Sequence, residues 1–490
     1  MNDLHTHSIT ALLDLLNQKK ITSVDIVNSL FNVIDKNDEK IGAYLYLDKE
    51  QILEDAKYCD KCREEGDNRD LLGIPISIKD LINVKDQPCT CSSKILKNYI
   101  SPYDATVIKK LKNAGAIIFG RVNMDEFAMG SSTENAALGK TSNPWNIDCV
   151  PGGSSGGSAA SVGGNLAIAS LGSDTGGSIR QPASFCGCVG LKPTYGRVSR
   201  YGLTAFASSL DQIGPITKTI KDAALLTDII SGEDDYDSTV SKQPPTEFLK
   251  LLDNVNSLEG IKIGLPKEYF IEGMDSEVES AIYNAVDECK RLGAEIVNVS
   301  LPHSKYAIAV YYIIATAEAS ANLARFDGIR YGERKSSDNL TDLYKNTRSL
   351  GLGDEVKRRI ILGTYVLSSG YYDAYYNRAQ KVRSLIKNDF EKVFKSCDVL
   401  LTPVSPTTAY LKGEKVDDPL KMYLDDILTT SVNLSGNCGI SLPCGFSSNN
   451  LPIGMQLIGD YFREDLILKV AHLYEKNTEW NNKNSEIIKL

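Results

Sequence analysis

Apolar residues along the chain follow two spacings, and the change from one to the other predicts helices and strands. Val24–Phe31 has the three- and four-residue spacing of an amphipathic helix, with Ser23 as its expected N-cap. Leu71–Leu81 is instead β-branched and almost continuously apolar, which predicts a buried strand with Lys79 near its end. The same criteria predict a helix near Ala105–Asn113 and a short strand at Ala116–Phe119.

The second half of the chain begins with a strand, a helix and a strand in that order. The strands are expected at Ile261–Gly264 and Ala294–Val299, and the amphipathic helix Ser276–Arg291 between them is closed by Gly293. Long helices are expected over Ala307–Ala324 and over Asp354–Lys395, the latter broken at Ser368–Gly370. This alternation favours an α/β fold.

Three late apolar runs are too few to form a sheet of their own. They lie at Val399–Leu401, Ile440–Leu442 and Ile453–Ile458. We therefore expect them to complete the sheet of the first half, giving one large α/β domain with a mixed parallel and antiparallel sheet and helices on both faces. Within residues 1–490 we expect an N-terminal helical segment (1–65), a core (66–232), an acidic connector (233–260) and a second part that completes the sheet and a substrate pocket (261–490).

Composition narrows the class of protein. The chain has 490 residues, 42% of them hydrophobic and 24% charged, as in ordinary globular proteins. Without an apolar run of about 18 residues or a signal peptide at the N-terminus, we expect a cytoplasmic protein that does not enter a membrane. The net charge of −9 argues against a chain that binds nucleic acid on its own, because phosphate neutralisation needs a basic face.

Cysteine and histidine usage limits the chemistry. The eleven cysteines are an odd number without framework spacing, which suits reduced thiols in a cytosol. The pairs Cys59–Cys62 and Cys89–Cys91 each lack a partner pair at zinc-site spacing, so we expect no metal site. Only four histidines are present, which leaves few candidates for a histidine base.

A glycine- and serine-rich stretch from Pro151 to Ser184 carries the candidate chemistry. Two Gly-Gly-Ser units place Ser154 and Ser178 24 residues apart (178 − 154). The segment between them, Ala159–Leu171, is small and apolar, so the stretch is not a flexible linker. Glycine allows backbone N–H groups to approach a ligand, and serine can act as nucleophile or proton relay.

Either serine could be the nucleophile on pattern alone. Ser154 lies in a Gly-x-Ser-x-Gly elbow pattern, but turn-forming residues precede it, and both His303 and His472 are poorly placed to serve as its base. Ser178 is the better candidate, since the segment before it can present backbone N–H groups as an oxyanion hole and a helix can start just after it. With histidine scarce, lysine is the remaining candidate for the base. The expected oxyanion-hole residues are Thr175, Gly176 and Gly177.

These motifs together resemble the amidase signature family. The resemblance lies in the Gly-Gly-Ser-Ser-Gly-Gly-Ser unit, the Asp-Thr-Gly-Gly-Ser-Ile-Arg-Gln-Pro unit, their separation, and an upstream Ile-Lys-Asp. It implies a Ser–Ser–Lys triad, with Ser178 as the acyl-forming nucleophile, Ser154 as a bridging serine after a cis peptide, and Lys79 as the base. Since the pKa of lysine is ordinarily about 10.4, burial must lower the pKa of Lys79 for it to act near pH 7.

Further segments resemble the branch of this family that hydrolyses glutamine within tRNA-dependent amidotransferases. They are Gly190–Gly202, Glu318–Leu323, Arg325–Gly328, Lys357–Ile360 and Ser368–Asp373. The resemblance implies a heterotrimer with B and C subunits. Ammonia would pass to the B subunit, which uses ATP and Mg²⁺ to amidate Glu-tRNA(Gln), Asp-tRNA(Asn) or both. Charged tRNA would bind mainly the B subunit, and this chain would need no cofactor. The alternative is a stand-alone amidase with another amide substrate.

The resemblance also implies residues that bind glutamine. The substrate has one anionic and one cationic group at its α-carbon, so its site needs one cation and one anion. Arg359 is assigned to the α-carboxylate and Asp426 to the α-ammonium, while Arg358 and Asp425 are adjacent alternatives. The remaining expected contacts are Tyr311, Met129 and Gly130.

Overall fold

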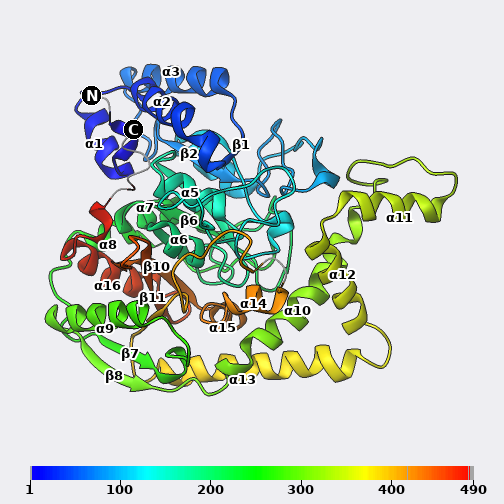
Figure 1. Ribbon diagram of the computed structural model, residues 1–490. Helices are drawn as coiled ribbons and strands as arrows, with labels where there is room; N and C mark the ends of the chain where they lie inside the picture. The colour runs from blue at the N-terminus through cyan, green and yellow to red at the C-terminus, as the bar shows by residue number, and fades with distance from the viewer. Residues whose placement is uncertain (1–2, 245, 416–417, 484, 486–490) are drawn as a thin grey trace.

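A mixed sheet of eleven strands runs through the part of the chain that this computed structural model describes, residues 3–244, 246–415, 418–483 and 485 (Figure 1). The strand order is β1-β3-β2-β4-β6-β5-β10-β11-β9-β7-β8. The strands are β1 (Tyr44–Tyr46), β2 (Pro75–Lys79), β3 (Ile117–Val122), β4 (Ala169–Asp174), β5 (Val189–Lys192), β6 (Gln212–Thr217), β7 (Lys262–Pro266), β8 (Glu295–Val299), β9 (Val399–Pro403), β10 (Cys438–Phe446) and β11 (Pro452–Gly459).

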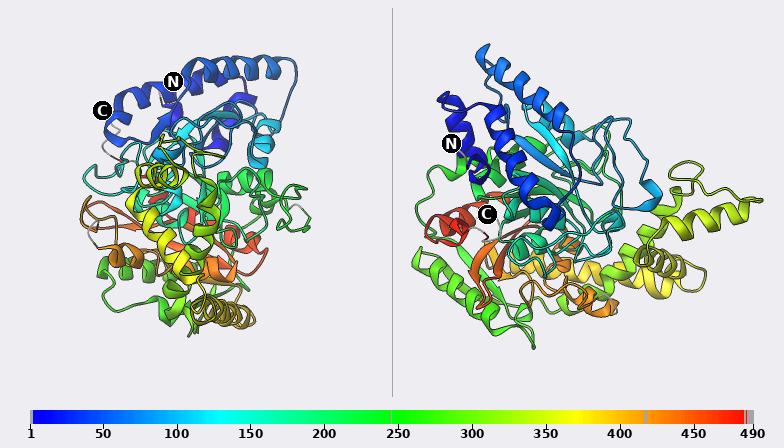
Figure 2. Two further views of the ribbon diagram at one scale, coloured as in Figure 1. Left: turned by 90° about the vertical axis from the view of Figure 1, so that its right-hand side faces the viewer. Right: turned by 45° about the horizontal axis from the view of Figure 1, so that its top comes forward.

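Helices cover the sheet. The first half contributes α1 (Ile9–Asn17), α2 (Ser23–Ile41), α3 (Lys49–Glu64), α4 (Thr106–Asn113), α5 (Gly156–Gly163), α6 (Arg180–Cys186) and α7 (Ile220–Ile230). The second half contributes α8 (Phe248–Leu252), α9 (Ser276–Arg291), α10 (Ala307–Asn322), α11 (Leu340–Gly351), α12 (Asp354–Val366), α13 (Arg378–Val393), α14 (Pro419–Leu424), α15 (Thr430–Ser435) and α16 (Glu464–Lys476). Helices α10 to α13 lie together on one side, and α11 projects from the body (Figures 1 and 2).

The late strands join the sheet of the first half, as predicted. Strand β10 pairs antiparallel with β5, with Ile440 opposite Leu191, and β11 and β9 follow. This confirms a single α/β fold built around one mixed sheet. The predicted connector at 233–260, of which residue 245 lies outside the described part, contains α8, and both Phe248 and Leu252 are buried.

Most predicted elements form, with one correction at a helix start. The N-cap of α2 is Thr22, not Ser23, because the Thr22 hydroxyl accepts from the Asp25 N–H while the Asp25 carboxylate accepts from the Thr22 N–H. The predicted break after α12 is present, and a π-helical turn at Tyr372–Asn377 precedes α13. Ser304–Arg325, which contains α10, is long and apolar enough to cross a membrane by length and composition, but half of its most apolar window is buried within the protein.

Strands β2, β3 and β4 position the candidate site. β2 lies between the other two and runs parallel to both, and all five of its residues are buried. Parallel strands end at the same edge of a sheet. The loops that follow Lys79, Val122 and Asp174 therefore lie close together at that edge.

Candidate active site

Lys79 is the last residue of β2, and its amine contacts three serines. Its Nζ lies 2.8 Å from Ser154 Oγ, 2.8 Å from Ser155 Oγ and 3.0 Å from Ser173 Oγ. The side chain is wholly buried. Burial lowers the pKa of Lys79 from 10.5 to about 7, although the charges of Asp125, Asp174 and Asp211 raise it. The amine is therefore about half neutral at pH 7 and can accept a proton.

Ser154 lies in a turn that requires glycine before it. The Gly153–Ser154 peptide is cis, and the Gly153 N–H donates to Gln181 Oε1 at 3.0 Å. A Cβ at Gly153 would lie 2.1 Å from Asp125 Oδ2, which leaves no space for a side chain. The Asp125 N–H in turn donates to the Ser154 carbonyl at 3.2 Å. Asp125 thus packs directly against the serine turn.

Ser178 lies in the turn between β4 and α6, beside the Ser154 segment. The Ser155 N–H donates to the Ser178 carbonyl at 3.2 Å, so the two predicted serine units meet through their backbones. Within the described residues, Ser178 Oγ makes no hydrogen bond, and none joins it to Ser154. The structure therefore brings Lys79 and Ser154 into contact and places Ser178 next to them, with the last link of the predicted relay open.

The three predicted oxyanion-hole residues differ in what their amides contact. The N–H of Gly177 donates to Asp174 Oδ1 at 2.8 Å, so it is occupied. The N–H groups of Thr175 and Gly176 have no acceptor in the described part of the chain. Burial alone would raise the pKa of Asp174, but the adjacent Arg180 lowers it to about 2, which keeps its carboxylate charged.

Arg359 lies on α12, and its side chain is buried among aromatic rings from other elements. Its guanidinium carbon lies 5.1 Å from the ring centroid of Tyr312 and 5.4 Å from that of Tyr423. Its Nε donates to Glu355 Oε1 at 2.7 Å, whereas its two terminal nitrogens contact no acceptor among the described residues. The side chain of the alternative Arg358 is 43% exposed, so Arg359 is the better placed cation.

Asp426 also has an unpaired polar atom. Its Oδ1 is buried and has no hydrogen-bond partner among the described residues. The alternative Asp425 is already satisfied by an ion pair with Lys415 and by Tyr410 Oη at 2.9 Å. Burial, together with the charge of Asp425, raises the pKa of Asp426 well above its ordinary value. A cationic group bound there would reverse that effect, so Asp426 is the better candidate for the ammonium contact.

The other predicted contacts lie around the Ser178 turn. A Cβ at Gly176 would lie 2.8 Å from Tyr311 Cζ, so the tyrosine ring packs on that turn. A Cβ at Gly177 would lie 3.3 Å from Asp426 Oδ1. The structure thus gathers Tyr311 and Asp426 at the turn that bears Ser178. Met129 and Gly130 are buried in the loop after β3, where Gly130 packs on Asp125.

Several polar residues of the site were absent from the sequence prediction, among them Ser155, Ser173 and Asp125. Ser155 contacts the Lys79 amine as closely as Ser154 does, and Asp125 supplies the largest opposing charge. Burial raises the pKa of Asp125 to about 6, while hydrogen bonds from the backbone of Thr133 and Asn135 lower it. A sequence signal exists for Asp125, because it comes shortly after the predicted strand at Ala116–Phe119.

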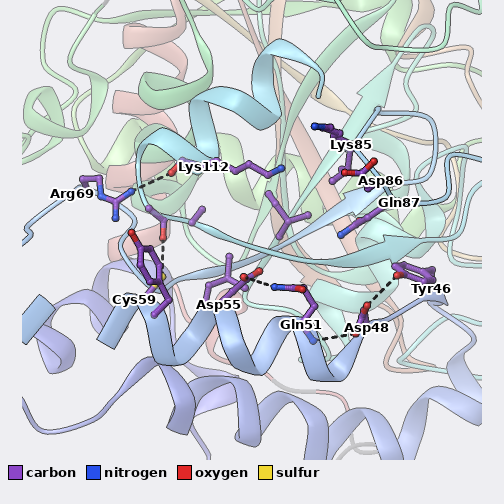
Figure 3. A pocket seen from close by; sticks show the side chains of 16 residues that line it. Tyr46, Asp48, Gln51, Asp55, Cys59, Arg69, Lys85, Asp86, Gln87 and Lys112 are labelled. Carbon is purple, nitrogen blue, oxygen red and sulfur yellow. Dashed lines mark hydrogen bonds between the residues drawn. The ribbon is translucent and has the colours of Figure 1, made fainter. Parts of the chain in front are cut away.

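Other polar groups of the molecule lie apart from this site. A polar cavity of about 460 Å³ lies between α3 and the loop after β2, lined by residues that include Asp48, Gln51, Asp55, Lys85 and Lys112 (Figure 3). None of the predicted site residues lines it. Among the described residues, no group of three or more His, Cys, Asp or Glu side chains could hold a metal ion.

Comparison with known proteins gives one consistent result. The family model described as "Amidase" matches residues 25–468. A protein of Methylacidiphilum infernorum, named as the glutamyl-tRNA(Gln) amidotransferase A subunit, is 59% identical over 474 residues, covering 96% of this chain and 94% of its own. A protein of Bacillus licheniformis with the same name is 55% identical over 486 residues, covering 99% of this chain and 100% of its own.

Solved structures agree on the fold. The crystal structure of a Thermotoga maritima protein with that same name superposes with a TM-score of 0.81 at 43% identity, covering 97% of this chain and 96% of its own. A peptide amidase from Stenotrophomonas maltophilia superposes with a TM-score of 0.81 at 26% identity, covering 96% and 97%.

Proposed function

The chain belongs to the amidase signature family, and from that premise we propose that it is the glutamine-hydrolysing subunit of a tRNA-dependent amidotransferase. The observation that carries the proposal is the Lys79 amine, wholly buried, 2.8 Å from Ser154 Oγ and with a pKa of about 7. A neutral buried lysine beside a serine is what a relay without histidine requires. The names of the full-length relatives support the choice of glutamine and of tRNA.

In the proposed reaction, Ser178 Oγ attacks the side-chain amide carbon of glutamine. Its proton passes to Ser154 while the Ser154 proton passes to the Lys79 amine, so a rotation of the Ser178 hydroxyl toward Ser154 closes the open link. The carbonyl oxygen becomes an oxyanion, which the free N–H groups of Thr175 and Gly176 stabilise. Return of the proton lets ammonia leave and forms a γ-glutamyl ester on Ser178. Water then cleaves this ester by the same relay, releasing glutamate and restoring the serine.

The buried charges at the site suit the α-amino acid end of the substrate. The unpaired terminal nitrogens of Arg359 can form a two-pronged contact with the α-carboxylate. The unpaired Oδ1 of Asp426 can accept from the α-ammonium, and Tyr311 can add a hydroxyl contact. In the proposal Met129 and Gly130 line the same pocket. Binding glutamine would pair two groups whose isolation in the interior is otherwise unfavourable.

The proposed complex is a cytoplasmic heterotrimer with B and C subunits. The B subunit binds most of the charged tRNA and uses ATP and Mg²⁺ to activate it, and ammonia from this chain completes the amidation. The net charge of −9 on this chain supports that division of labour, because tRNA phosphates favour a basic surface. This chain holds no cofactor of its own in the proposal.

The test is ammonia release from glutamine by the full-length chain with and without its companion subunits and charged tRNA. Ser178→Ala should abolish release while leaving thermal unfolding unchanged. Turnover by Ser178→Ala at the wild-type rate would refute the nucleophile assignment. A chain that hydrolyses simple amides faster than glutamine, and equally well without companions, would instead be a stand-alone amidase.

A further inference from the structure

Glu355 is a buried acid that contacts the candidate substrate-binding arginine. It lies in the first turn of α12, and its side chain is only 4% exposed. Its Oε1 accepts from Arg359 Nε at 2.7 Å and from Tyr423 Oη at 3.0 Å. Its Oε2 accepts from Nη1 of Arg358. One carboxylate therefore holds the buried arginine, its exposed neighbour and an aromatic side chain from α14.

Among the described residues, the contacts around Arg359 leave one edge of its guanidinium unoccupied. Glu355 accepts from Nε of Arg359. The rings of Tyr312 and Tyr423 are stacked with their centroids 3.9 Å apart, and they lie near the guanidinium together with the ring of Phe206. The two terminal nitrogens have no acceptor in the described part of the chain. A guanidinium that donates through Nε can still present its terminal N–H groups to a planar carboxylate.

We propose that Glu355 is a positioning residue that selects substrates carrying an α-carboxylate. It does not touch the substrate. It fixes Arg359 through Nε and holds Tyr423 beside the guanidinium through its hydroxyl, so that the terminal nitrogens stay directed at the substrate. This inference rests on the proposed function, in which Arg359 binds the α-carboxylate of glutamine.

The same carboxylate separates the two neighbouring arginines. Arg358 lines a small cavity of about 30 Å³ together with Glu134 and Lys415, and Glu355 holds its Nη1 there. A neutral amide at position 355 would turn an N–H₂ group toward one of the two cations. Loss of the charge would therefore loosen Arg359 without changing Lys79 or the serines, and the effect should fall on substrate binding.

The experiment measures ammonia release by the full-length chain, purified with its companion subunits, from two amides. Glutamine carries the α-carboxylate, and 4-aminobutanamide is the same molecule without it. Glu355→Ala should raise the KM for glutamine at least about tenfold and leave kcat within about threefold. The kcat/KM for 4-aminobutanamide should stay within about threefold of the wild type. The KM of Glu355→Gln for glutamine should lie between those of the wild type and Glu355→Ala. The matched control is Asp354→Asn, one residue earlier and with a side chain that is 91% exposed. It should leave KM and kcat unchanged for both substrates.

If Glu355 had a merely structural role, its loss would lower kcat/KM for both substrates in parallel, and that result overturns the inference. An unchanged KM for glutamine in both variants overturns it as well. If Glu355→Ala does not fold, Glu355→Gln, which preserves the shape of the side chain, decides between these outcomes. A wild-type complex that releases no ammonia from glutamine overturns the proposed function and this inference with it. Wild-type turnover with an unchanged KM in the variants overturns the inference alone.

Discussion

The pH dependence of glutamine hydrolysis tests the central feature of the site, the buried neutral lysine. With the pKa of Lys79 at about 7, its amine is about half neutral at pH 7, whereas an ordinary lysine with a pKa of 10.5 would be only about 0.03% neutral. The site therefore increases the population of the neutral Lys79 amine by a factor on the order of 10³. That factor corresponds to roughly 4–5 kcal/mol, since each unit of pKa is about 1.4 kcal/mol.

The expected profile of kcat/KM rises with pH and levels off above about pH 7, because only the neutral amine accepts the Ser154 proton. Between pH 6 and pH 8 the rate should increase about tenfold, and further increases should be small. The assay is ammonia release at subsaturating glutamine from pH 5.5 to 8.5. A rate that keeps rising about tenfold per pH unit up to pH 8.5 would refute the reasoning, since it would mean a lysine of ordinary pKa.

Asp426 provides the control for this profile. Its pKa is also raised, so protonation of Asp426 could produce a rising limb of its own by weakening the contact with the α-ammonium. Asp426→Asn removes that titration and leaves Lys79 in place. If the midpoint near pH 7 persists in the variant, it belongs to the lysine; if the limb disappears, the lysine assignment is wrong.

Four further changes test other parts of the structure. Asp125→Asn removes a negative charge beside Lys79 and should shift the midpoint of the same profile downward by up to about 1 unit; an upward shift would contradict the proposed electrostatics. The free energy of unfolding of Lys79→Met, measured in urea relative to the wild type, should fall as the pH rises above 7, by up to about 2 kcal/mol at pH 9. The sign follows because the pKa of Lys79 is lower in the folded protein than in the unfolded chain. Above pH 7 the unfolded chain keeps the lysine proton and the folded protein does not, so raising the pH stabilises the wild type. Asp426→Asn should raise the KM for glutamine roughly 10- to 100-fold without lowering the melting temperature, because Oδ1 has no partner to lose among the described residues; a lowered melting temperature would show a structural role. Gly157→Ala should destabilise the fold by about 3 kcal/mol, since the new Cβ would lie 2.4 Å from the Asn123 carbonyl oxygen; an unchanged unfolding curve would show that α5 can move away from β3.

The sequence was most informative where one local pattern determines structure. The apolar run before Lys79 predicted a buried strand, and β2 ends at that residue with every side chain buried. The late strands were assigned to the first sheet by counting, and β10 pairs with β5. The scarcity of histidine directed attention to lysine, and the structure places the Lys79 amine on Ser154.

Contacts that depend on which groups meet in space were not predictable in the same way. The amide of Gly177 was expected to be a free donor, but Asp174, three residues earlier, accepts from it. Aspartate commonly accepts from backbone N–H groups a few residues on, so this contact had a local signal. The grouping of Arg359, Glu355 and Tyr423 had none, because α14 lies more than fifty residues from α12 in the chain and meets it only after folding.

The pKa of Lys79 results from two opposing effects that come from the same topology. Parallel strands β2 and β4 and the loop after β3 bring the lysine and the acids Asp125 and Asp174 to one sheet edge. Burial at that edge lowers the pKa of the amine, whereas the carboxylates raise it. With burial alone the amine would be neutral but weakly basic, and with the acids unopposed it would stay protonated. If Lys79 is the base, as proposed, activity near neutral pH requires both effects, and the buried acids are part of what tunes the amine.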